Sequence, residues 1–163
     1  MKTGDYVVHW SGKVCRVEDQ KILDFTGEKR EYYLLSPVRD SAEKIYVPVE
    51  KSGSVLRPVL TKSEAEALIG RMQEIEPLLI RDEKQRAQEY KNAFYSQDYE
   101  NLVKIAKELY QRREKRLREG KTLPSKDEQM MSLVEKTFEE EMAIALGVDK
   151  EKVRTIIEEG SQK

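Results

Sequence analysis

Hydrophobic and polar residues follow two different periods along the chain, and the change comes near residue 60. Before it, short β-branched and aromatic runs are separated by turn-forming residues, which is typical of short strands. The runs are Tyr6–Trp10, Lys13–Glu18, Glu31–Leu35, Lys44–Val49 and Leu56–Pro58. About five short strands with close turn signals predict a small, strongly bent sheet or barrel.

Two short segments refine this prediction. Phe25-Thr26-Gly27-Glu28 is typical of a hairpin turn that leads into the third strand. Pro48 has no backbone N–H to give to a strand ladder, so it indicates an edge strand or a bulge.

After residue 60 the apolar residues recur at helical spacing. Thr61 and Glu64 form a capping-box pattern, in which the threonine caps the helix and the glutamate reaches back to it. Ser125 and Glu128 form the same pattern and predict the start of a later helix.

The ends of the helices are predicted from glycine and proline. Pro77 removes a backbone donor and interrupts the first helix, and a second helix is expected near Asp82. Gly120 and Gly147 are expected to end the third and fourth helices in the left-handed conformation. The third helix carries an apolar stripe of Leu102, Ile105, Ala106, Leu109 and Leu117. A short last helix follows Asp149. The fold class is therefore α+β, with a β domain at 1–60 and an all-α domain of about five helices at 61–163.

Composition narrows the class of protein. The 163 residues suffice for one domain or two small ones, with 38 % hydrophobic and 37 % charged residues. The single cysteine, Cys15, excludes an internal disulfide and fits a reducing compartment. No N-terminal signal segment and no apolar run of membrane-spanning length is present, so a cytoplasmic protein with no membrane contact is expected.

The charge is unevenly distributed, although the net charge is only −1. Residues 81–121 hold 12 basic and 8 acidic residues, whereas residues 122–163 hold 6 basic and 10 acidic residues. The densest basic run is Arg112–Arg118, at the end of the third predicted helix. Cations there complement the helix dipole on an otherwise solvated face. The other interpretation is a patch that contacts nucleic-acid phosphates, and charge alone leaves both open.

Catalytic groups are sparse. His9 and Cys15 are the only histidine and cysteine, and no third group is evident that would orient a Cys–His pair. A buried cysteine beside a half-buried histidine is the simpler interpretation. Two such ligands cannot complete a structural zinc site, and no glycine-rich phosphate loop is present. We therefore expect no enzymatic activity, no metal and no cofactor.

Several segments, taken in order, resemble the RNA polymerase-interacting domain of the CarD-like family of bacterial transcription regulators. They are Gly4–Val17, Glu31–Leu35, Lys44–Glu50 and Leu56–Pro58. The same module is similar to one in the transcription-repair coupling factor. The helical half is also similar to the CarD-like family, through Arg86–Lys91, Ser96–Asp98 and Leu109–Arg113.

The resemblance implies a Tudor-like, SH3-like β module that binds the β subunit of RNA polymerase. An edge strand can pair with a partner's sheet through its backbone, and Lys44–Val49 is the expected edge. Tyr46 stands where the family often has a basic residue; it either anchors the interface or is an ordinary cross-strand aromatic. The predicted polymerase-binding residues are Lys21, Lys44, Tyr46 and Pro48.

For the helical half, the resemblance implies contact with promoter DNA at the upstream edge of the transcription bubble. Family members place a tryptophan there as a wedge, but this chain reads Asp82–Arg86 at that position, and its only tryptophan is Trp10. Contact is therefore expected mainly with phosphates, without readout of base sequence. The predicted DNA-binding residues are Lys84, Arg86, Lys91, Arg112, Arg113, Lys121 and Lys126.

Together these features predict a monomeric, non-enzymatic regulator of open promoter complexes. The near-neutral charge and the missing wedge leave an alternative open, which is an adaptor on RNA polymerase that binds proteins and never contacts DNA.

Overall fold

A computed structural model describes the backbone of residues 1–161 and the side chains of residues 1–156. Residues 162 and 163, the end of the predicted helical domain, lie outside the described residues.

The chain forms two compact units, Met1–Val59 and Leu60–Lys163. The first, the β unit, contains β1 (Tyr6–His9), β2 (Val14–Leu23), β3 (Arg30–Pro37), β4 (Ile45–Pro48), η1 (Val49–Lys51), α1 (Ser52–Val55) and β5 (Leu56–Pro58). The second, the helical unit, contains α2 (Lys62–Gly70), η2 (Met72–Glu74), η3 (Glu83–Gln85), α3 (Arg86–Tyr95), α4 (Glu100–Arg118), α5 (Ser125–Leu146) and α6 (Lys150–Ser161).

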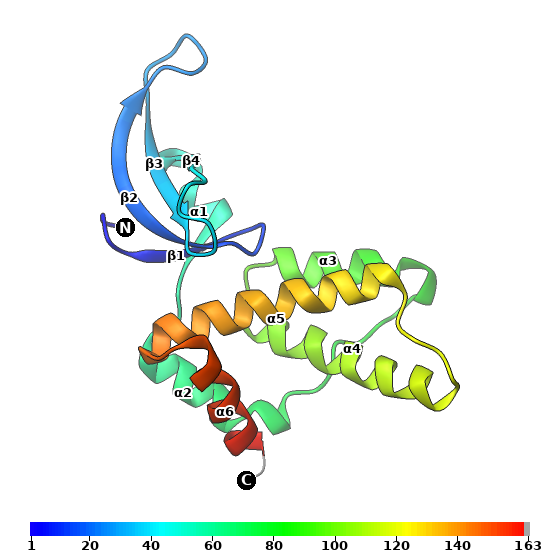
Figure 1. Ribbon diagram of the computed structural model, residues 1–163. Coiled ribbons are helices and arrows are strands. Elements are labelled where there is room, and N and C mark those ends of the chain that lie inside the picture. The colour runs from blue at the N-terminus through cyan, green and yellow to red at the C-terminus, as the bar shows by residue number, and fades with distance from the viewer. Residues whose placement is uncertain (162–163) are drawn as a thin grey trace. The chain divides into compact units, whose positions relative to one another are not determined.

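The β unit is one antiparallel sheet with the strand order β4-β3-β2-β1-β5. The predicted α+β class, with a bent N-terminal sheet followed by about five helices, is confirmed. β2 and β3 form a long, curved hairpin (Figure 1), and the register shifts between Val17 and Asp19. Such a bulge bends its strand and increases the local twist. Gly27 lies in the hairpin loop at φ +85°, a conformation that favours glycine, as the turn prediction requires.

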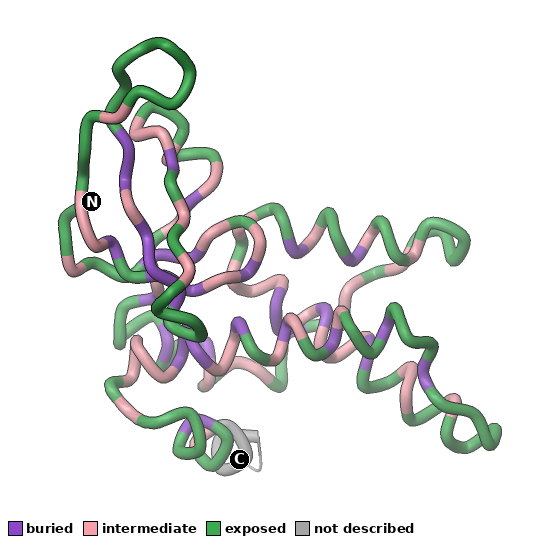
Figure 2. The backbone as a smooth tube through the Cα atoms, turned by 45° about the horizontal axis from the view of Figure 1, so that its top comes forward, coloured by how far each residue is buried: buried purple, intermediate pink, exposed green. Residues whose placement is uncertain are grey.

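The core of the β unit lies on one face of this sheet. Side chains alternate between the two faces of a strand, so residues two apart share a face. Tyr33 and Leu35 of β3 point into the core, where they meet Val47 of β4 and Val17 of β2. Val7, Cys15 and Leu56 complete this buried cluster. The buried stretches of the strands stand out in Figure 2.

Helix ends in the helical unit follow the sequence prediction in part. Thr61 caps α2 in a full capping box, because its hydroxyl accepts from the Glu64 amide while the Glu64 carboxylate accepts from the Thr61 amide. The second predicted box is wrong. Pro124 occupies the N-cap position of α5, and Ser125 is already inside the helix. Gly147, at φ +68°, ends α5 as predicted.

Helix α5 is the centre of the helical unit and packs against α2, α3, α4 and α6. One buried cluster joins α3, α4 and α5 through Tyr90, Ile105 and Met131. A second cluster joins α2, α4, α5 and α6, with Leu68 and Met142 fully buried.

Three of the five residues of the predicted stripe on the third helix are buried, and Ala106 is partly buried against the same cluster. The fifth, Leu117, is 56 % exposed, so the stripe is not buried along its whole length. It lies in the last turn of α4, where the chain turns away at Gly120, at φ +76°. Within the part of the chain that the structure describes, no helix has the length and apolar character needed to cross a membrane.

Candidate functional site

The first predicted surface is built around strand β4. This strand lies at one end of the sheet and pairs only with β3, so the predicted edge is confirmed. In its register with β3, Tyr46 lies opposite Leu34 and Pro48 lies opposite Tyr32. An edge strand presents backbone N–H and C=O groups that no neighbouring strand uses.

Three of the predicted polymerase-binding residues share the sheet face opposite the core. Lys21 lies opposite Tyr32, and Tyr32 lies opposite Pro48, so these three residues cross the sheet on one face. Tyr46 is two residues from Pro48 and therefore points to the same side. We call this surface, formed by Lys21, Tyr32, Tyr46 and Pro48, the outer face of the sheet. Lys44, just before β4, is exposed, and its ammonium donates to the Ser41 carbonyl at 3.2 Å.

An aromatic group on the outer face was missed by the sequence prediction. Phe25, from the β2–β3 hairpin loop, is 58 % exposed, and its ring lies edge-on to both Tyr46, at 5.3 Å, and Tyr32, at 5.1 Å. Tyr46 is itself 44 % exposed. Partly exposed aromatic rings are the residues that most often anchor protein interfaces. The loop was predicted only as a turn, and the sequence gives no sign that Phe25 folds back over the sheet.

The second predicted surface lies in the helical unit. Its cations are of two kinds: the first are paired with carboxylates of the same unit, and the second form no ion pair among the described residues. Arg86 belongs to the first kind, because its guanidinium pairs with the Asp127 carboxylate at 2.6 Å and lies over the Tyr90 ring at 5.7 Å. Only 5 % of the Asp127 side chain is exposed. The arginine therefore neutralises a buried charge, and this pairing links the start of α3 to the start of α5.

Arg112 is held in the same way. Its guanidinium pairs with Glu108 at 2.6 Å and with Glu83 at 3.1 Å. Burial works to lower the pKa of Arg112, but its hydrogen bonds to the two glutamates hold the pKa above its ordinary value. Glu108 also accepts a hydrogen bond from the Tyr90 hydroxyl. Burial and this hydrogen bond raise the pKa of Tyr90 to about 12.

Arg113 and the predicted lysines form the second kind. Arg113 lies over the Tyr110 ring at 5.3 Å, and one of its guanidinium nitrogens contacts the Met131 sulfur. Among the described residues, Arg113 forms no ion pair within 4.0 Å, and neither do the four lysines. These lysines, all exposed, are Lys84, Lys91, Lys121 and Lys126.

Cys15 is buried and His9 is half-buried, as the simpler interpretation of these two residues predicted. Cys15 is fully buried and lies opposite Val7 in the sheet, and its thiol points to the Lys13 carbonyl. His9 contacts the Ser11 hydroxyl through Nδ1 at 2.7 Å. Burial first, and then the nearby Lys13 charge, lower the pKa of His9. The described residues contain no group of three or more histidine, cysteine or carboxylate side chains placed to hold a metal ion.

Comparison with known proteins gives a match for the β unit. The family model described as CarD-like/TRCF RID domain matches residues 1–60. No curated protein matches the chain. The resemblance drawn from the sequence is thus confirmed for the β unit, which carries the exposed edge and the outer face. Residues 1–60 form a CarD-like RNA polymerase-interacting domain, and RNA polymerase is the partner to which this part of the chain is adapted.

Proposed function

We propose that this chain is a cytoplasmic, monomeric regulator of transcription initiation. Its β unit binds the β subunit of RNA polymerase, and its helical unit contacts upstream promoter DNA and changes the stability of the open complex. The observation that carries the proposal is the match of residues 1–60 to an RNA polymerase-interacting domain whose edge strand is exposed.

The β4 edge and the outer face together suit a protein partner. The backbone of β4 can pair with a strand of the partner, which supplies affinity but little specificity. Tyr46 and Phe25 lie beside that edge and offer aromatic surface that a pocket on the partner can bury. Lys44 adds positive charge, which steers association with an acidic surface. Lys21 is paired with Asp19 at 3.8 Å, but this pair is exposed and can rearrange around a partner.

The test is binding of the full chain to purified RNA polymerase. Tyr46→Ala is expected to weaken binding about tenfold or more, the effect typical of an aromatic anchor. Tyr95→Ala is the matched control, since Tyr95 is also 44 % exposed but lies in α3 of the helical unit. We expect the control to bind within about twofold of the wild type. If both variants bind equally well, the outer face is not the polymerase-binding surface.

The proposed contact with DNA depends on the unpaired cations. Arg86 and Arg112 already neutralise carboxylates of the helical unit, so moving them onto phosphates would leave Asp127 and Glu108 unpaired. Exposed lysines carry no such cost. Tethering through the β unit raises the effective concentration of DNA near them, so weak phosphate contacts suffice. The shift between closed and open promoter DNA is limited by the difference in affinity for the two states.

The salt dependence of polymerase–promoter complexes tests this contact. Replacing Lys121 and Lys126 together with methionine should lower the slope of log affinity against log salt by about two, one for each lost phosphate contact. Arg112→Met should leave the slope unchanged, because that arginine is occupied by Glu83 and Glu108. A slope that falls with Arg112→Met and not with the lysine variant would reverse this assignment.

A second function is favoured by the same ion pairs. Since two of the predicted DNA-binding arginines are engaged within the helical unit, that unit can instead serve as an adaptor that contacts only proteins. In that case the affinity for promoter complexes would not depend on the lysines at any salt concentration.

We also propose that the chain is not an enzyme; the burial of Cys15 and the engagement of His9 with Ser11 support this.

A further inference from the structure

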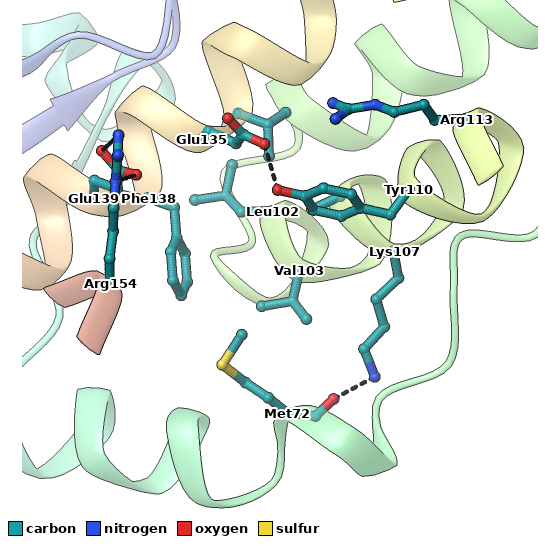
Figure 3. A pocket seen from close by; sticks show the side chains of 12 residues that line it. Met72, Leu102, Val103, Lys107, Tyr110, Arg113, Glu135, Phe138, Glu139 and Arg154 are labelled. Carbon is teal, nitrogen blue, oxygen red and sulfur yellow. Dashed lines mark hydrogen bonds and ion pairs between the residues drawn. The ribbon is translucent and has the colours of Figure 1, made fainter. Parts of the chain in front are cut away.

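A cavity of about 600 Å³ lies within the helical unit, open to solvent on one side. Its volume falls within the range of small-molecule sites, about 300–1,000 Å³. Figure 3 shows an apolar interior formed by Met72, Leu102, Val103 and Phe138, from η2, α4 and α5. Of the predicted polymerase-binding and DNA-binding residues, Arg113 alone also lines this cavity.

The polar residues at the rim mostly satisfy one another. Tyr110 donates to Glu135 at 2.5 Å, and Arg154 donates to Glu139 at 2.8 Å. Burial, together with the hydrogen bond to Glu135, raises the pKa of Tyr110 to about 12, so its hydroxyl stays a donor at neutral pH. Lys107 donates to the Met72 carbonyl and, at 2.6 Å, to the Ile75 carbonyl, which fixes η2 against α4.

Arg113 is the exception at this rim. Its guanidinium lies over the Tyr110 ring and contacts the Met131 sulfur, which is only a weak acceptor. Its Nε is buried and has no hydrogen-bond acceptor. Among the described residues, Arg113 thus lacks a carboxylate partner such as Arg154 has at this rim, so the accessible part of its guanidinium can donate to an anion in the cavity. In Figure 3 the guanidinium of Arg113 extends over the ring of Tyr110, toward the α5 side of the cavity.

Charge at the cavity favours a singly charged anion. Lys107, Arg113 and Arg154 line it together with the carboxylates Glu135 and Glu139, which leaves a balance of three positive and two negative charges. A carboxylate matches this excess of one, and its planar geometry suits a guanidinium. A doubly charged phosphate would meet stronger repulsion from the two glutamates.

We propose that this cavity binds a small organic acid, with its carboxylate on Arg113 and its apolar body between α4 and α5. Octanoate is a suitable probe of this chemistry, and 1-octanol is its neutral control. Both should perturb the amide resonances of Leu102, Val103 and Phe138 in the full-length protein. Octanoate should bind about ten- to a hundredfold more tightly, as expected for a charge-assisted hydrogen bond.

Two variants separate the cavity from general attraction to positive charge. Arg113→Met should remove the preference for octanoate over 1-octanol. Arg118→Met, a control near the end of the same helix at an exposed arginine without an ion pair among the described residues, should keep it. If Arg113→Met does not fold, the comparison of the two probes on the wild type still decides. Equal affinity for both probes, perturbations outside the cavity, or no binding in the low-millimolar range would overturn the proposal.

Discussion

The two units of this chain use their charged residues in opposite ways. In the β unit, ion pairs such as Lys13–Glu43 join side chains that are 38 % and 37 % exposed. In the helical unit, Arg86 and Arg112 reach carboxylates that are 5 % and 13 % exposed. The β unit therefore buries no charged side chain and keeps its charges on the surface. The helical unit holds α3, α4 and α5 together partly through buried ions.

This difference teaches where to look for function in each unit. Exposed ion pairs contribute little to stability, so surface charges of the β unit can rearrange around a partner at small cost. Removing one member of a buried pair leaves an uncompensated charge, which costs far more. In the helical unit, the residues that are able to contact a partner are therefore those outside the buried network.

The largest expected effect comes from breaking the buried network. Arg86→Met leaves the Asp127 carboxylate buried without its partner and should lower the free energy of unfolding of the helical unit by about 3–5 kcal/mol. Urea unfolding followed by far-UV circular dichroism measures this loss. Trp10, the only tryptophan, reports separately on the β unit by fluorescence.

The matched control is in the β unit. Lys13→Met removes the exposed pair with Glu43 and should cost less than about 1 kcal/mol. If Arg86→Met and Lys13→Met lower the free energy of unfolding equally, the ion pair of the helical unit contributes no more to stability than the exposed pair of the β unit.

The next effect is on the pH dependence of stability. The pKa of Tyr90 is raised to about 12 in the folded protein, against 10.0 for a free tyrosine. Between these values the unfolded chain loses the phenol proton and the folded chain keeps it, so stability falls as pH rises from 10 to 12. The loss is at most about 3 kcal/mol. Tyr90→Phe should make this part of the curve of unfolding free energy against pH less steep and leave the contribution of Tyr110, whose pKa is also raised to about 12. A curve that remains equally steep would assign the loss to other groups.

The smallest effect compares two helix starts within the helical unit. Thr61→Ala removes the cap of α2 and should lower the free energy of unfolding by about 1 kcal/mol. Ser125→Ala should cause no measurable loss, because Ser125 caps nothing. The same urea titration measures both, and a loss at Ser125 equal to that at Thr61 would contradict the assignment of the α5 start.

The prediction of secondary structure from the sequence succeeded where the determining contacts are local. The box of Thr61 and Glu64 spans one helical turn, and glycines such as Gly147 act on their own backbone, so these features were correctly predicted. The box at Ser125 failed because the helix begins one residue earlier than predicted. Pro124 takes the N-cap position, and the carboxylate of Asp127, in the first turn, is engaged by Arg86.

The candidate surfaces were predictable only in part, because some of the contacts that determine them join residues far apart in the chain. The edge position of β4 follows from a strand that contains Pro48, and it was predicted correctly. Asp127, which pairs with Arg86, lies 41 residues away, and Glu83, one of the two partners of Arg112, lies 29 residues away, so the local density of charge could not reveal these two pairs. A basic run in a sequence gives only the number of positive charges. Which of these charges remain available to a partner depends on the ion pairs that form when the chain folds.

The brevity of β4 sets a limit on how long any complex formed through it lasts. The strand has four residues, and the last of them, Pro48, offers no amide hydrogen. A partner strand that pairs with this edge forms only a few main-chain hydrogen bonds. Dissociation requires little more than breaking these bonds and the contacts with the neighbouring aromatic rings. Binding through this edge is then readily reversible. It also leaves too little open ladder for copies of the chain to stack into a continuous ribbon.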